Sequence, residues 1–133
     1  MNLKKAIPTM IAVFVVANIF GFLIHAVLLK PDYLPIAGYY RQPGTEKMLF
    51  ISLAYLAFAI GSVWVYAKGV EDKGWWEQGI RFGLAMWLVL TVPSFVIAYA
   101  VQPVPGMLVV KQLLFEGLGK LLLGLLTAAL YRP

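Results

Sequence analysis

The chain has 133 residues, of which 62% are hydrophobic and 13% are charged, and its mean hydropathy is +0.83. Soluble domains are about 45–50% apolar and about 25% charged, so this chain has too little polar surface to enclose a water-soluble core. It has no cysteine and one histidine, which excludes disulfides and multi-histidine metal clusters, and its net charge of +5 comes from scattered Lys and Arg residues that suit anionic lipid headgroups better than nucleic acid.

Four stretches have the length of about 20 apolar residues that a transmembrane helix needs. They cover about 6–29, 48–68, 79–101 and 107–131, and Pro or Gly residues stand at their ends. The first stretch is longer than the apolar region of a signal peptide, so we interpret it as a retained span. The sequence therefore predicts an all-α integral membrane protein: one domain, residues 1–133, forming an antiparallel four-helix bundle with short connections and one longer outer loop, residues 30–47.

Lys and Arg residues are unevenly distributed between the two ends of the predicted bundle. Because positive residues collect on the cytoplasmic side, we expect both chain ends and the 69–78 turn in the cytoplasm and the 30–47 loop outside. The outline is similar to that of many small four-span inner-membrane families of bacteria, and no motif selects one of them. One side carries Lys4, Lys5, Lys68, Lys73, Arg81 and Arg132, and the other carries Lys30, Arg41 and Lys47.

The most informative polar residues lie in the fourth predicted span. Gln112, Glu116 and Lys120 are spaced at i, i+4 and i+8, which places them on one helix face, and Glu before Lys is the favourable order for an ion pair. A charge at the centre of a span costs about 2.5–3.5 kcal/mol on insertion scales. This face is therefore predicted to point into the bundle, while the neighbouring Lys111 extends towards the headgroups.

Polar residues of the other three spans are expected to meet this face. Counting about 1.5 Å per residue from the middle of each span places Glu116 and Tyr55 about 4–5 Å outward, and His25 and Gln112 about 10 Å outward. We predict a ligand-binding cluster in the outer half of the bundle, with Lys120 as its deepest member and Arg41 above its mouth. The predicted site residues are His25, Arg41, Ser52, Tyr55, Ser94, Gln112, Glu116 and Lys120.

Several features leave two interpretations open. Glu116 and Lys120 form either a structural ion pair or a site for a ligand or proton. His25 makes an interhelical hydrogen bond, accepts a proton, or ligates haem or chlorophyll, and the last needs a second subunit or a five-coordinate metal. The 30–47 loop, which three prolines and two glycines should keep irregular, is a headgroup anchor or a lid, and Pro93 should kink the third span.

No catalytic signature is present, since the sequence lacks a phosphate loop, a nucleophile elbow and an HExxH motif. We predict no catalytic residue, no metal site and no cofactor. The first functional hypothesis is an intramembrane pocket that binds or transports a small molecule or a proton. The second is a non-catalytic structural or accessory subunit, and the third is a lipid-binding protein; the expected partners are membrane lipids, a small-molecule ligand, and further copies or subunits of a membrane complex.

Overall fold

The computed structural model describes residues 1–132 and contains the four predicted apolar helices, which confirms the all-α fold. The spans cover Leu3–Leu28, Met48–Gly69, Trp75–Val101 and Gly106–Leu130. The first span begins three residues earlier than predicted because the Asn2 side chain caps it by accepting a hydrogen bond from the Lys4 N–H. The third begins four residues earlier than predicted, directly after the extended Gly74. All four helices are long and apolar enough to cross a membrane.

Two of the spans contain π-helical segments. The first consists of α1 (Leu3–Gly21) and η1 (Phe22–Leu28), and the third of α4 (Trp75–Met86), η3 (Trp87–Thr91) and α5 (Val92–Val101). Pro93 has no N–H to donate, and the turn before it is widened so that the Val92 N–H donates to the Trp87 carbonyl. The regular helix is thus interrupted where the proline was expected to disturb it.

The prediction that the 30–47 loop has no regular structure is wrong for its first half. Residues 30–39 form a short helix, α2 (Lys30–Tyr33), and a 3-10 helix, η2 (Leu34–Tyr39). Pro31 and Pro35 lie in the first positions of these two segments, where a missing N–H removes no helical hydrogen bond. This short helix holds Asp32 and Tyr33 beside the bundle, while residues 40–47 are irregular.

Helix α4 packs closely along α6 (Gly106–Leu130), and glycines allow this approach. A Cβ atom added at Gly124 would lie 2.4 Å from the Gly79 carbonyl oxygen, and one added at Gly83 would lie 2.6 Å from that of Lys120. Small residues at such spacing let helix backbones meet in a bilayer. The contact also fixes the height and rotation of the part of α6 that carries Lys120.

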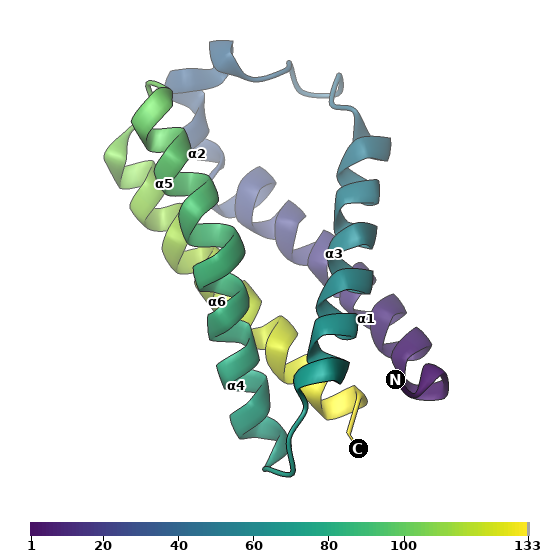
Figure 1. Ribbon diagram of the computed structural model, residues 1–133. Coiled ribbons are helices and arrows are strands. Elements are labelled where there is room, and N and C mark those ends of the chain that lie inside the picture. Colours follow the sequence, from purple (N-terminus) through teal and green to yellow (C-terminus); the bar gives the residue numbers. More distant parts are fainter. Residues whose placement is uncertain (133) are drawn as a thin grey trace.

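The bundle is packed at the end that carries the chain termini, which we call the inner end, and open at the end that carries the 30–47 loop, which we call the outer end. Figure 1 shows the two chain ends at the same end of the bundle as the α3–α4 turn, and α3 (Met48–Gly69) standing apart from α5 and α6 towards the outer loop. Val13, Val63 and Leu123 belong to the buried core of the inner half. At the outer end of α3, by contrast, Met48 and Phe50 are 61% and 64% exposed. The outer part of α3 is therefore little covered by the other helices.

Candidate functional site

The polar face of α6 points into the bundle, and its charges are paired there. Lys120 Nζ donates to Glu116 Oε2 at 2.8 Å, and His25 Nε2 lies 2.8 Å from Glu116 Oε1. The Glu116 and Lys120 side chains are only 13% and 14% exposed. The ion pair that the i, i+4 spacing indicated is present, with the imidazole of η1 as a third member.

A chain of hydrogen bonds continues from His25 towards the outer surface. His25 Nδ1 lies 2.8 Å from the Tyr33 hydroxyl, and Gln112 Nε2 donates to the same hydroxyl at 2.8 Å. A carboxylate can only accept hydrogen bonds, so the geometry assigns the imidazole proton to Nε2, facing Glu116. The Tyr33 hydroxyl then donates to Nδ1 and accepts from Gln112. Every member of this chain has a partner when His25 is neutral.

Tyr33 is the principal member that sequence reasoning missed. It lies in the 30–47 loop, which the sequence predicts to be a headgroup anchor or a lid, but α2 turns it back onto α6 and η1. Burial raises the pKa of the Tyr33 phenol, which therefore keeps the proton that it donates to the imidazole. The sequence does contain one signal for Tyr33, because it stands two helical turns after His25 and would share its helix face. Pro31 lies between the two residues and argued against a continuous helix.

Lys111 also differs from its expected position. Its ammonium donates to the Asp32 carboxylate at 2.7 Å instead of extending freely to headgroups. This ion pair ties α2 to the outer end of α6, next to the hydrogen bond between Tyr33 and Gln112. With the hydrogen bond between Tyr33 and His25, three polar contacts therefore hold the short helix α2 to the bundle.

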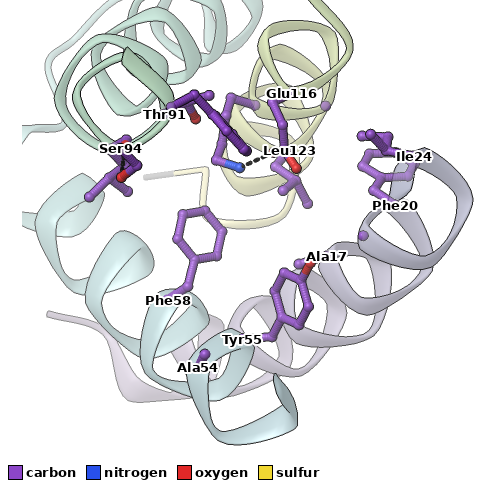
Figure 2. Close-up of a pocket in the computed structure, with 15 residues that line it drawn as sticks. Ala17, Phe20, Ile24, Ala54, Tyr55, Phe58, Thr91, Ser94, Glu116 and Leu123 are labelled. Atoms are coloured by element: carbon purple, nitrogen blue, oxygen red, sulfur yellow. Dashed lines mark hydrogen bonds and ion pairs between the residues drawn. The ribbon is translucent and has the colours of Figure 1, made fainter. Parts of the chain in front are cut away.

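Beside the ion pair lies a cavity of about 550 Å³. Figure 2 shows Tyr55 and Phe58 projecting from α3, with Thr91 and Ser94 on the opposite wall and Glu116 on α6. Most of the lining is apolar; the charged pair Glu116–Lys120 lies on the α6 side, and Tyr55, Thr91 and Ser94 bring hydroxyl groups from the other walls. The lining residues are Ala17, Phe20, Gly21, Ile24, Ala54, Tyr55, Phe58, Leu90, Thr91, Ser94, Phe95, Glu116, Gly119, Lys120 and Leu123.

The structure brings most of the predicted site residues together and leaves two apart. Tyr55, Ser94, Glu116 and Lys120 line the cavity, and His25 and Gln112 belong to the hydrogen-bonded chain. Ser52 does not line the cavity because it lies nearly one turn further out on α3, where that helix leans away from the others. Arg41 is exposed in the irregular half of the outer loop. These last two form no part of the described site.

Two aromatic residues complete the surroundings of the polar groups. The Lys120 ammonium lies 5.3 Å from the centre of the Phe58 ring, within reach of a cation–π contact. The Phe95 ring stacks on His25 with the ring centres 6.2 Å apart. Both rings cover polar side chains on the sides that face α3 and α5. Sequence reasoning placed neither of them in the site, because a phenylalanine in an apolar span carries no distinguishing signal.

The arrangement does not favour a resident metal or haem. Both ring nitrogens of His25 are engaged, Nδ1 by Tyr33 and Nε2 by Glu116, so neither is free to coordinate haem iron or chlorophyll magnesium. Within residues 1–132 no three His, Asp or Glu side chains lie close enough to share a metal ion. What the site offers chemically is hydrogen bonding and a compact pair of opposite charges.

Comparison of the chain with known protein families, with curated proteins and with solved structures finds no match. The geometry of the cavity and of its polar wall is therefore the basis for a function.

Proposed function

We propose that this protein binds a small molecule inside the bilayer, in the cavity whose polar wall is the Glu116–Lys120 pair. The cavity of about 550 Å³ is the observation that supports this proposal. Ligand sites of about 300–1,000 Å³ with an apolar lining and a few converging polar groups are typical of small-molecule binding. Ionisable groups inside a membrane usually face such a site or one another.

Binding is favoured over passage across the membrane because the space ends at the level of Lys120. The next void towards the inner end measures about 10 Å³, which is close to the space that one water molecule needs. Leu123 lines both the cavity and this small void, and together with Val13 and Val63 it belongs to the buried core. Transport of a ligand or proton would therefore require α3 to move relative to α1 and α6.

A matched pair of alanines on α3 tests the proposal. Ala54 lines the cavity, whereas Ala57, also exposed and on the same helix, does not. We expect the indole of Ala54→Trp to fill the cavity, and we expect Ala57→Trp to leave the cavity open to a ligand. The protein would be purified in nanodiscs formed from its own membrane, and bound molecules would be identified by native mass spectrometry. Adducts should be lost in Ala54→Trp and kept in Ala57→Trp; their absence from the parent protein, or equal retention in both variants, would contradict the proposal.

A second proposal, a structural or accessory subunit of a larger membrane complex, is supported by the internal pairing of the polar cluster. Glu116, Lys120, His25 and Gln112 all have partners within the chain, so the cluster can stabilise the bundle without any ligand. Gentle solubilisation followed by native electrophoresis and mass spectrometry tests it. A complex of defined composition, or a homo-oligomer, would support this role; a monomer that carries a small-molecule adduct would contradict it.

We also propose that the protein lies in a bacterial-type inner membrane with both chain ends in the cytoplasm. The excess of Lys and Arg at that end of the bundle supports this orientation. Since the natural chain has no cysteine, single cysteines report topology cleanly. In intact cells a membrane-impermeant maleimide should label Gln42→Cys, in the outer loop, and should label Asp72→Cys, in the α3–α4 turn, only after lysis. The reverse pattern would require the opposite orientation.

A further inference from the structure

The mouth of the cavity opens towards the acyl chains of the bilayer. Its rim includes Ala54 on α3 and Leu90 and Ser94 on the opposite wall, all of them exposed, and Leu90 is 42% exposed. Counting about 1.5 Å per residue from the middle of each span places these residues about 3–9 Å from the midplane, inside the roughly 15 Å half-thickness of the hydrocarbon. A ligand that enters between α3 and α5 must therefore be soluble in lipid.

The polar wall of the cavity holds one charged donor with hydrogen bonds left to offer, the Lys120 ammonium, which cannot accept any. Lys120 has three N–H donors, and Glu116 takes one of them. Tyr55 and Thr91 bring hydroxyl groups that form no hydrogen bond with residues 1–132, whereas the Ser94 hydroxyl is already donated to the Leu90 carbonyl. Both oxygens of Glu116 are engaged. The hydroxyl groups can donate or accept, but the two remaining N–H groups of Lys120 can only donate, so a ligand that pairs with Lys120 carries a hydrogen-bond acceptor.

The charge balance of the site favours an uncharged acceptor. The Glu116 carboxylate and the Lys120 ammonium neutralise each other at 2.8 Å, and the hydrogen-bonded chain is complete with a neutral His25. An anionic headgroup would add an uncompensated charge at a depth where an unpaired charge is strongly disfavoured. A carbonyl oxygen accepts the same hydrogen bonds without that cost. The rings of Phe20, Phe58 and Phe95 provide flat apolar walls around it.

We infer that the ligand is a neutral, lipid-soluble carbonyl compound whose oxygen accepts a hydrogen bond from Lys120 and whose apolar part leaves between α3 and α5. This inference rests on the proposed ligand-binding function and specifies the class of molecule. Membrane-soluble quinones and glyceride esters both present this chemistry, the former with a flat ring and the latter with flexible chains. The experiment below separates these two sources.

The test compares four probes that enter membranes, each added separately to nanodiscs that hold the purified protein. Decylubiquinone and dioleoylglycerol carry carbonyl groups, dodecylbenzene has no acceptor, and dodecyl phosphate is an anion. Native mass spectrometry measures the fraction of protein that retains each probe. We expect at least one carbonyl probe to be retained about tenfold more than dodecylbenzene and dodecyl phosphate, because a hydrogen bond to a charged group is worth about 1.5 kcal/mol or more. Preference for one carbonyl probe identifies the source.

Two variants test the donors. Lys120→Met should reduce retention of the preferred carbonyl probe about tenfold, and Tyr55→Phe about fivefold, as expected for loss of one charged and one neutral donor. Tyr55→Phe keeps the ring and leaves the ion pair intact, so it remains informative where Lys120→Met fails to fold. Tyr99→Phe, an exposed tyrosine outside the cavity, is the matched control and should have no effect.

The outcomes distinguish this inference from the proposed function. Equal retention of dodecylbenzene and the carbonyl probes, abolished by Ala54→Trp, would overturn the carbonyl inference and leave the binding pocket standing. A preference for dodecyl phosphate, or unchanged retention of the carbonyl probe in Tyr55→Phe, would also overturn the inference. If the parent protein retains none of the four probes, the inference fails. The proposed ligand-binding function also fails if the parent protein in nanodiscs formed from its native membrane carries no bound molecule.

Discussion

At the crossing of α4 and α6, Gly83 leaves no room for a side chain. A Cβ atom at this position would lie 2.6 Å from the Lys120 carbonyl oxygen and 2.8 Å from the Leu121 Cα atom. Ordinary contact begins at 3.4 Å, so the helices would have to separate by about 0.8 Å in Gly83→Ala. Both obstructing atoms belong to the backbone, and no side-chain rotation relieves the overlap. Gly61 on α3 is the matched control, because a Cβ atom there meets nothing within 4 Å.

The difference between the two variants isolates the cost of the overlap. Overpacking costs about 1–3 kcal/mol, while replacing a helical glycine by alanine gains about 1 kcal/mol of helix propensity at either position. Gly61→Ala is therefore expected to be neutral or slightly stabilising. Gly83→Ala should be less stable than Gly61→Ala by about 1–3 kcal/mol, because the propensity term is common to both.

Reversible unfolding by sodium dodecyl sulfate in mixed micelles, followed by circular dichroism, measures this difference. Retention of the preferred probe supplies a second measurement. The carbonyl that the added Cβ atom would meet belongs to Lys120, so Gly83→Ala should displace Lys120 and reduce binding of the probe. Equal stability of Gly83→Ala and Gly61→Ala would refute the close α4–α6 approach. Reduced stability with full binding would show that the position of Lys120 tolerates the shift.

Three further substitutions or titrations probe the polar groups. Tyr33→Phe leaves the Gln112 amide and the His25 imidazole without their hydroxyl partner and should lower the free energy of unfolding by about 1–3 kcal/mol. The control Tyr40→Phe, at an exposed tyrosine, should change this free energy by less than about 0.5 kcal/mol. Equal effects of the two substitutions would contradict the hydrogen-bonded chain. Glu116→Gln leaves the Lys120 charge uncompensated and should lower the free energy of unfolding by about 3–5 kcal/mol in the same assay. Replacing both Glu116 and Lys120 by leucine should restore most of that stability. If Glu116→Gln has no effect on stability, the pair does not stabilise the fold. In the exposed α3–α4 turn, the hydrogen bond and charge of Lys73, and then those of Arg81, hold the pKa of Glu71 below its ordinary value. The stability that Glu71 contributes is therefore present above its unfolded-state pKa and is lost as the pH falls through its lower, folded-state pKa. Carbon NMR should show the Glu71 carboxyl titrating below its ordinary pKa and moving back towards it in high salt, and titration at the ordinary value would contradict this pairing.

The fold could be predicted from hydropathy because a bilayer leaves few alternatives. Backbone groups inside the hydrocarbon must satisfy one another, so an apolar stretch of sufficient length forms a helix. The polar face of α6 was equally predictable, since the i, i+4, i+8 spacing of Gln112, Glu116 and Lys120 fixes their relative direction in any regular helix. Both inferences depend only on local geometry that the bilayer enforces.

What the sequence could not provide is the tilt of helices and the departures from regular geometry. Counting residues gives the depth of a side chain but not the lean of its helix, and the lean of α3 is what separates Ser52 from the cavity that Tyr55 lines. Likewise, small residues occur at the same spacing in three spans. On the third span, Gly79 and Gly83 meet the backbone of α6, whereas Gly61 on α3 faces open space.

The two π-helical segments lie on opposite sides of the same polar region, and this coincidence bears on function. η1 carries His25, which reaches Glu116, and η3 carries Leu90 and Thr91, which line the cavity. Irregular backbone in a bilayer is tolerated only where protein or a cavity surrounds it, and π-helical turns are frequent at functional sites. An ion pair whose only role was to pin α6 in place would require neither widened turn, because Glu116 and Lys120 satisfy each other within one helix. Pro93 accounts for the widened turn of η3, but η1 contains no proline, and its widened turn places His25 beside Glu116 on the cavity wall. For this reason we favour a binding pocket over a purely structural cluster.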